Sequence, residues 1–289
     1  MPRLLVTGAY GYLGSRLRKA VEVAGWESTA LVRHPRTGDA ALAWTLGETV
    51  PSSAFAGIDA LLHCAYDLTV RTEDAIRRVN IDGSRALLQS AERAGVKKIL
   101  VISSMSAYEG TRQLYGRAKL AIESLTLELG GIAVRPGLVY GINPGGMAGN
   151  LVRLASLPVV PVLDGNAKQY TVHEDDLAAV LIRVLNAPSW TPEVFGVAHP
   201  RAVSFRELIS GQSRGNRNHR VVPIPWRVLY AILNVSELLR FPIRLRADSL
   251  LGLVYPAPYV ASSSAYPDIP DCLRPFPVSG FAAEAKASE

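Results

Sequence analysis

The chain has 289 residues, of which 48% are hydrophobic and 19% are charged. This much apolar sequence can bury one large core, or one core with a smaller lobe packed against it. The formal net charge is +6, but the basic residues are spread along the chain and are not interleaved with aromatic side chains. The pattern excludes a dedicated nucleic-acid-binding arm and suits an anionic cofactor.

Cysteine content and hydropathy exclude further classes. Cys64 and Cys272 are the two cysteines and lie far apart in the sequence, so neither a disulfide framework nor a metal site is expected. The longest apolar region, residues 221–239, contains Arg227, Glu237 and two prolines, so no membrane span is expected there. The first residues lack the features of a secretory leader, and we expect a cytoplasmic protein.

Short apolar runs alternate with amphipathic stretches over the first hundred residues, which is typical of parallel strands joined by crossover helices. We predict strands at residues 4–7, 29–32, 60–64, 99–103 and 132–135. We predict helices at residues 13–24, 75–94 and 115–129. Gly25 and Gly95 stand where glycine C-caps would end the first two helices.

The character of the sequence changes after Gly141, where Pro144 and two glycines open a loop. We predict an α/β fold: a Rossmann-like, doubly wound parallel sheet in residues 1–141, and a smaller C-terminal lobe, mainly for substrate, in residues 142–289. Segments at about 170–200 are expected to return to the first domain. The later elements predicted are a helix at 175–186, a strand at 194–198, a helix capped by Ser204 and running through residue 209, and an irregular tail after Pro256.

A glycine-rich loop follows the first predicted strand and opens the first predicted helix, in the order Thr-Gly-Ala-Tyr-Gly-Tyr-Leu-Gly from residue 7. Gly8 would allow a tight turn, Gly11 a close approach to a pyrophosphate, and Gly14 close packing of helix and strand. A glycine-rich turn without a ligand is the alternative, but the position between strand and helix favours a dinucleotide. The cofactor-binding residues predicted here are Gly8, Tyr10, Gly11, Tyr12, Leu13 and Gly14.

The second predicted strand is followed by Arg33 and Arg36, where NAD-binding enzymes usually present an acidic residue to the ribose. A guanidinium can hold the 2′-phosphate of NADP through paired, charge-assisted hydrogen bonds, whereas a carboxylate would repel it. We therefore favour NADP(H) over NAD(H). The alternative is that both arginines are solvated loop residues.

Tyr115 and Lys119 lie one helical turn apart, so their side chains leave the same face of a predicted helix. An ammonium group beside a phenol favours the phenolate, so we expect Lys119 to lower the pKa of Tyr115 towards the working pH. Ser104, at the end of the preceding strand, is the predicted partner at the substrate oxygen, with Ser103 and Ser106 as competitors. Taken alone, such a pair is more often a surface pair, but its place at the carboxyl edge of the sheet favours catalysis.

With these motifs in place, the chain resembles the extended short-chain dehydrogenase/reductase family, also called the NAD-dependent epimerase/dehydratase family. Besides the glycine loop and the Tyr115/Lys119 pair, the resemblance rests on DALLHCA from residue 59, VNIDGS from 79, RPGLVYG from 135 and VHEDDLA from 172. It implies that Lys119 also contacts the nicotinamide ribose, that Ser104 polarises the substrate oxygen, and that Ala65 and Pro136 line the cofactor.

The resemblance also suggests roles for three further polar residues, each with a structural alternative. Asp59 would lie near the adenine loop or cap a turn. Asn80 would support the site or be a buried residue satisfied by the backbone. For His173, capping or orienting a helix is the favoured interpretation.

Three functions remain open from the sequence. The first is a reductase or dehydrogenase that acts on a small-molecule carbonyl/alcohol pair. The second is a nucleotide-sugar epimerase or dehydratase with tightly held NAD, for which Glu109 is the nearby acid. The third is a cofactor-sensing regulator without catalysis.

Two departures from the sugar-nucleotide enzymes weaken the second function: a short loop before Tyr115, and residues 168–170 (Lys-Gln-Tyr) where an arginine would hold the diphosphate. An apolar ketone lined by Trp226, Tyr230 and Leu233 is an alternative, although such a stripe is more often core. The family often forms homodimers through helices that correspond to residues 75–94 and 115–129.

Overall fold

The computed structural model describes residues 1–157, 159–163, 168–212, 220–239, 246–255, 257 and 263–277. A seven-stranded parallel sheet forms its centre, in the order β11-β6-β5-β4-β1-β2-β3. The strands are β1 (Arg3–Thr7), β2 (Glu27–Val32), β3 (Ala41–Ala43), β4 (Ala60–His63), β5 (Lys98–Ile102), β6 (Ile132–Pro136) and β11 (Val194–Val197). The predicted doubly wound α/β fold is confirmed.

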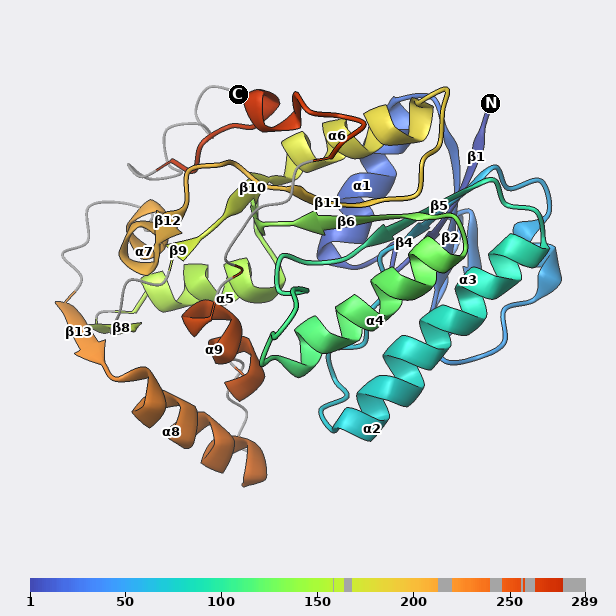
Figure 1. The fold of residues 1–289 in the computed structure, drawn as a ribbon. Helices are drawn as coiled ribbons and strands as arrows, with labels where there is room; N and C mark the ends of the chain where they lie inside the picture. Colours follow the sequence, from blue (N-terminus) through green and yellow to red (C-terminus); the bar gives the residue numbers. More distant parts are fainter. Residues whose placement is uncertain are drawn as a thin grey trace.

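Helices cover both faces of this sheet (Figure 1). On one face lie α1 (Tyr12–Val23) and α6 (Glu174–Asn186), and on the other α2 (Glu73–Ile76), α3 (Gly83–Arg93) and α4 (Leu114–Glu128). Alternate residues of β1 serve the two faces: Leu4 and Val6 belong to the core under α1 and α6, and Leu5 to the core under α3 and α4. The edge where the parallel strands end is therefore held rigidly from both sides.

A smaller group of elements gathers beyond one end of the sheet (Figure 1). Its helices are α5 (Gly146–Ala155), α7 (Phe205–Gln212), α8 (Trp226–Leu238) and α9 (Ala247–Val254), and its strand pairs are β7 (Leu138–Tyr140) with β10 (Thr171–His173), β9 (Lys168–Gln169) with β12 (Val203–Ser204), and β8 (Val159–Leu163) with β13 (Arg220–Ile224). Residues such as Leu151, Leu208, Leu233 and Leu250 form a separate core here. Within the described residues, no helix is long and apolar enough to cross a bilayer.

Most predicted elements lie within one or two residues of the observed bounds, and Gly25 and Gly95 have the positive φ angles of C-caps, at 90° and 79°. The helix predicted at 75–94 is present as a continuous helical stretch from Glu73 to Arg93, and its π-helical segment, Arg77–Asp82, between α2 and α3 was not predicted. The short edge strand β3 was not predicted.

The structure contains the helix predicted after Ser204 and part of the tail predicted to be irregular. Ser204 precedes α7 as predicted and forms a reciprocal pair with Glu207: the Ser204 hydroxyl accepts from the Glu207 amide at 3.2 Å, and the Glu207 carboxylate accepts from the Ser204 amide at 2.7 Å. The helix ends three residues later than predicted, at Gln212. Of the tail after Pro256, residues 263–277 are irregular apart from a 3-10 turn at Ile269–Cys272, and much of the rest lies outside the described residues.

Candidate active site

The glycine loop closes through its own backbone. The Gly11 amide donates to the Gly8 carbonyl oxygen at 2.9 Å, and Gly8 has a φ of 65°, which favours glycine. A Cβ atom at Gly14 would lie 2.2 Å from the Gly8 oxygen, and one at Gly8 would lie 2.9 Å from the backbone of Ala65. No side chain caps α1 at Gly11, and its first turn carries no acid, so its free amide groups suit a pyrophosphate. These residues fit a dinucleotide.

The loop after β2 is tied to the glycine loop through Tyr10. The Tyr10 hydroxyl donates to Asp39 at 2.7 Å and accepts from the Arg36 amide at 3.1 Å, and the Arg36 guanidinium lies 4.2 Å from the centre of the Tyr10 ring. Asp39, which the sequence interpretation missed, receives two hydrogen bonds from Arg18 at 2.6 and 2.7 Å. Hydrogen bonds from Arg18 and Tyr10 lower the pKa of Asp39 to about 2.

Arg33, which directly follows β2, lies near enough to Asp67, in the loop after β4, for its charge to act on that carboxylate. Burial works against ionisation of Asp67, but hydrogen bonds from Thr69 and the charge of Arg33 together lower its pKa. Arg33 and Arg36 are both exposed, at the edge where β2 ends. The structure therefore brings both predicted arginines to the same edge as Gly8 and Ala65.

The three predicted catalytic residues meet where β5 ends and α4 begins. The Ser104 side chain lies close enough to the Tyr115 phenol to lower the pKa of that phenol. The ammonium of Lys119, which is 3% exposed, donates to the Ile102 carbonyl oxygen at 2.7 Å and lies 5.8 Å from the centre of the Tyr115 ring. A hydroxyl pair with a buried cation behind it can exchange a proton with an oxygen atom placed beside it.

Burial has the largest effect on the pKa values of Tyr115 and Lys119. It raises the pKa of Tyr115 to about 12, against the lowering effect of the Ser104 hydrogen bond. Burial also lowers the pKa of Lys119 to about 8, while Cys64 and Glu123 act in the opposite direction. The expectation that Lys119 would bring the pKa of Tyr115 below its usual value is therefore not met in this structure, because loss of hydration has the largest effect on the pKa of this phenol.

The competing serines have other environments. The Ser103 hydroxyl donates to the buried carboxylate of Glu123. The same carboxylate receives two hydrogen bonds from Arg135, at 2.7 and 2.8 Å. Ser106 donates its backbone amide to the Ser104 hydroxyl oxygen at 3.1 Å and thereby fixes it. Ser104 is thus the serine that faces Tyr115.

Two residues beside the pair were not predicted to belong to the site. Tyr66 packs edge-on against Tyr115, with 4.9 Å between ring centres, and the Lys119 ammonium lies 5.0 Å from the Tyr66 ring centre. His63 is buried between Thr7 and Ser84, at 2.7 and 2.9 Å, and burial together with the charge of Lys119 lowers its pKa to about 3. His63 is therefore a neutral support for the strand ends. The sequence signal for both is their closeness to Ala65: His63 lies two residues before it and Tyr66 lies directly after it.

The amino end of α4 is capped from the C-terminal lobe. Asp248, in the first turn of α9, accepts hydrogen bonds from the backbone amides of Leu114 at 2.8 Å and Tyr115 at 3.3 Å. Its own carbonyl oxygen accepts from the Gln113 side chain at 2.7 Å. The position before the helix, Gln113, offers no side-chain cap itself. A carboxylate from the other lobe therefore completes the helix that carries Tyr115.

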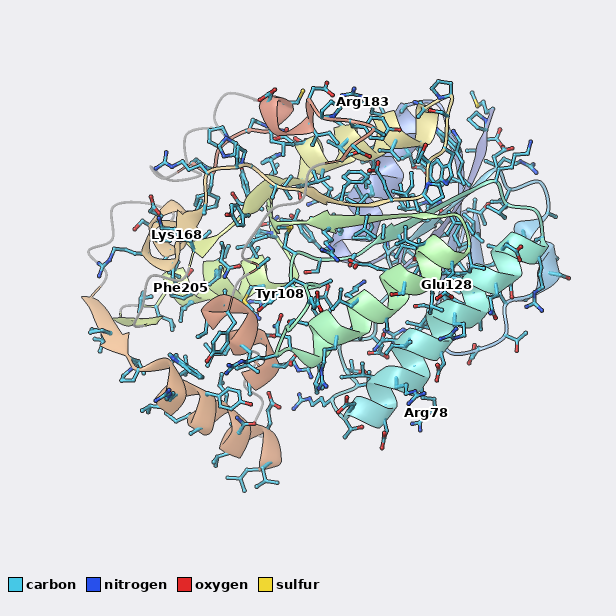
Figure 2. All side chains as sticks on the ribbon, viewed as in Figure 1. Arg78, Tyr108, Glu128, Lys168, Arg183 and Phe205 are labelled. Atoms are coloured by element: carbon cyan, nitrogen blue, oxygen red, sulfur yellow. The ribbon has the colours of Figure 1, made fainter. Side chains whose placement is uncertain are left out.

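A second contact joins the same two regions. Tyr108, labelled in Figure 2 beside α9, donates its hydroxyl to the Tyr255 carbonyl oxygen at 2.7 Å. The Arg112 guanidinium lies 4.4 Å from the centre of the Tyr255 ring, and Trp226 packs edge-on against that ring at 5.6 Å. The short loop between Ser104 and Tyr115 is thus held against α8 and α9.

Of the other residues singled out from the sequence, Pro136 lies beside Ser104, whereas Tyr12 and Leu13 make contacts elsewhere. Pro136 ends β6, and its carbonyl oxygen accepts from the amide of Met105, which follows Ser104. Tyr12 donates to the buried Glu174 at 2.6 Å, and burial and this contact raise the pKa of its phenol. Leu13 packs against the core beside α1. Glu109 is exposed.

For the three residues with open roles, the structural alternatives hold. Asn80 is fully buried and exchanges two hydrogen bonds with the Asp67 backbone, at 2.6 and 3.1 Å. His173 caps α6 by accepting from the Asp175 amide. Asp59 binds the Arg3 amide at the amino end of β1, so its suggested place near the adenine loop was wrong.

The three residues of α8 considered as a lining for an apolar ketone belong to the core of the C-terminal lobe or pack against it. Leu233 is 2% exposed and belongs to the core of the C-terminal lobe, with Trp226 and Tyr230 partly buried against it. Gln169, where an arginine was sought, donates its side-chain amide to carbonyl oxygens of Gly252 and Leu253, each at 3.2 Å. It therefore supports α9.

The chain is similar to several known proteins and solved structures. A ceramide reductase from Caulobacter vibrioides is 31% identical over 219 residues, which cover 67% of this chain and 69% of that protein. A 4-hydroxy-2-methyl-3-oxo-4-farnesyl-3,4-dihydroquinoline-1-oxide ketoreductase from Stigmatella aurantiaca is 28% identical over 172 residues, 49% of this chain and 51% of that protein. Mycobacterial relatives are longer, and this chain spans 26% of their length.

The solved structure of MoeE5 in complex with UDP-glucuronic acid and NAD superposes with a TM-score of 0.64 at 23% identity, covering 87% of this chain and 97% of that one. The model of the NAD dependent epimerase/dehydratase family matches residues 4–198, which include the glycine loop, the Tyr115/Lys119 pair and β11. With the parallel sheet and the site at its carboxyl edge, this match shows that the chain belongs to the NAD dependent epimerase/dehydratase family.

Proposed function

We propose that this chain is an NADP(H)-dependent oxidoreductase that interconverts a carbonyl group and an alcohol, with Tyr115 as general acid and base. The observation that carries the proposal is the placement of Ser104 beside Tyr115, next to buried Lys119 and at the same sheet edge as the glycine loop. This arrangement offers one substrate oxygen two hydroxyl groups and a nearby positive charge.

The residues act on the substrate oxygen. When bound, the nicotinamide supplies a hydride to the carbonyl carbon, or accepts one from it in the reverse direction. During reduction, negative charge develops on the oxygen, Ser104 donates a hydrogen bond to it, and Tyr115 donates the proton that completes the alcohol. The ammonium of Lys119, 5.8 Å from the Tyr115 ring centre, stabilises the phenolate that this transfer leaves.

Preference for NADP(H) is part of the proposal, and Arg33 and Arg36 support it. The Arg36 guanidinium packs on the ring of Tyr10, a residue of the glycine loop. The acid of this loop, Asp39, is occupied by Arg18 and Tyr10. A 2′-phosphate at this edge would meet two guanidinium groups and a carboxylate that is already neutralised.

We propose an apolar carbonyl compound as the substrate, held mainly by residues 142–289. Gln169 serves α9 and stands where a diphosphate-binding arginine was sought, which weakens the case for a sugar nucleotide. The similarity to a ceramide reductase and to a farnesylated quinoline-oxide ketoreductase supports a lipid-like molecule.

The test combines cofactor binding with turnover. The purified, cofactor-stripped protein should bind NADPH exchangeably and oxidise it with long-chain ketones. Tyr115→Phe should lower kcat by about a thousandfold while the Kd for NADPH stays unchanged, because the variant loses the proton donor and keeps the glycine loop. If NAD copurifies, resists removal and is recycled on nucleotide sugars, the chain is an epimerase or dehydratase. If no substrate turns over and Tyr115→Phe changes nothing, a cofactor-sensing regulator replaces both.

A further inference from the structure

Helix α8 lies at the periphery of the described chain (Figure 1), and several of its apolar side chains are exposed. We call the face that carries these side chains the outer face of α8. The side chains of Val228, Ile232, Val235 and Leu239 recur at positions i, i+4, i+7 and i+11, with 51%, 53%, 55% and 60% exposure, and Leu238 beside them is 81% exposed. Single exposed apolar residues are ordinary, but a continuous stripe along one helix marks a binding surface.

The charges of α8 are arranged around this face. Glu237 is the one acidic residue between positions 226 and 239, and it points inward, where it accepts from the Ala247 amide at 2.8 Å. Arg227 is exposed at the margin of the outer face. The surface is therefore apolar with a positive edge and without an acidic group of its own.

We infer that the outer face of α8 docks onto an anionic phospholipid bilayer. A helix that lies in the interface buries its apolar face among the acyl chains and keeps basic side chains at the headgroups, and the net charge of +6 adds attraction to an anionic surface. A second copy of the chain fits less well. A helix of 13 residues is about 20 Å long and about 10 Å wide, a face far smaller than the roughly 800 Å² per partner of a stable protein interface.

Two successive helix caps connect this face to the candidate catalytic residues. Glu237 of α8 caps α9 through Ala247, and Asp248 of α9 caps α4 through Leu114 and Tyr115. A bilayer under α8 would therefore lie next to the lobe proposed to hold an apolar carbonyl compound. The link to catalysis rests on the proposed function, whereas the docking itself does not.

Flotation with lipid vesicles tests the docking without any turnover. The full chain should float with vesicles of phosphatidylcholine and phosphatidylglycerol in equal amounts, and less so at high salt. A variant with both Ile232→Asp and Val235→Asp should lose at least about tenfold in partitioning, because two charges enter the acyl region. Arg227→Gln should weaken binding to these vesicles and leave binding to pure phosphatidylcholine unchanged.

Val23→Asp is the matched control, since Val23 lies on α1 with 83% exposure and should float like the unaltered chain. Equal NADPH affinity and melting temperature in all variants would show that they are folded. The inference is overturned if the unaltered chain does not float, or if Val23→Asp loses as much binding as the α8 variant. It is also overturned if sedimentation shows a dimer that the α8 variant dissociates, because the face then binds a second copy.

Discussion

The glycine loop and the amino end of α4 both present backbone amides at the same sheet edge, but they are completed in different ways. The glycine loop is closed by its own backbone, through the Gly11 amide and the Gly8 carbonyl oxygen. The start of α4 is completed by Asp248, which lies 134 residues after Leu114. A site element built from local backbone geometry leaves a motif in the sequence, whereas one completed across lobes does not.

Gly14→Ala disrupts the glycine loop, the element closed by its own backbone, and should have the largest effect of the variants compared below. The new Cβ would lie 2.2 Å from the Gly8 oxygen, so the loop must open and its amides no longer converge on the pyrophosphate. We expect the Kd for NADPH to rise by about a hundredfold, the equivalent of losing one or two charge-assisted hydrogen bonds, in a fluorescence titration. Ser15→Ala, on the next residue, should bind normally. An unchanged Kd in Gly14→Ala would mean that the loop does not hold the cofactor.

The same contrast explains what could be predicted from the sequence. All strands of the sheet except β3, together with α1, α4, α6 and the gathering of Ser104, Tyr115 and Lys119, follow from periodicity and from motifs that fix backbone geometry. Asp248 could not be predicted as a neighbour of Tyr115, because only the packing of distant segments brings it there. Tyr66 directly follows Ala65, which was predicted to line the cofactor, but its ring contact with Tyr115 also depends on that packing.

Electrostatic expectations depended equally on packing. The acidity of Tyr115 was predicted from one neighbour, Lys119, while the structure shows that burial has the larger effect and raises the pKa. Asp39 was not anticipated beside Tyr10, because it follows Arg33 and Arg36 in the sequence. Its hydrogen bonds with Tyr10 and Arg18 depend on how the loop after β2 folds back against α1. Charge patterns along a chain therefore predict which groups gather more reliably than how they ionise.

The arginines after β2 offer a finer test of the local element. Arg33→Ala combined with Arg36→Ala should raise the Kd for NADPH by about thirtyfold and change the Kd for NADH little, because only the 2′-phosphate loses its partners. Arg183→Ala, an exposed arginine paired with Asp268, is the control and should leave both constants unchanged. Equal losses for NADPH and NADH would show that the arginines hold a part common to both cofactors.

Asp248 tests the element that spans the two lobes, with the smallest expected effect. Asp248→Ala removes the acceptor from the Leu114 and Tyr115 amides, which should cost about 1 kcal/mol of stability and, by loosening the first turn of α4, lower kcat about fivefold. Asp248→Asn keeps an acceptor and should recover most of the kcat.

Glu207→Ala is the matched control for that comparison, because it removes a helix cap in the same lobe that does not touch α4. It should lower the melting temperature by a similar amount and leave kcat and the Kd for NADPH unchanged. If both variants lower kcat equally, the effect of Asp248 is loss of lobe stability. If only Asp248→Ala lowers kcat, and Asp248→Asn restores it, the C-terminal lobe sets the position of Tyr115 through this one carboxylate.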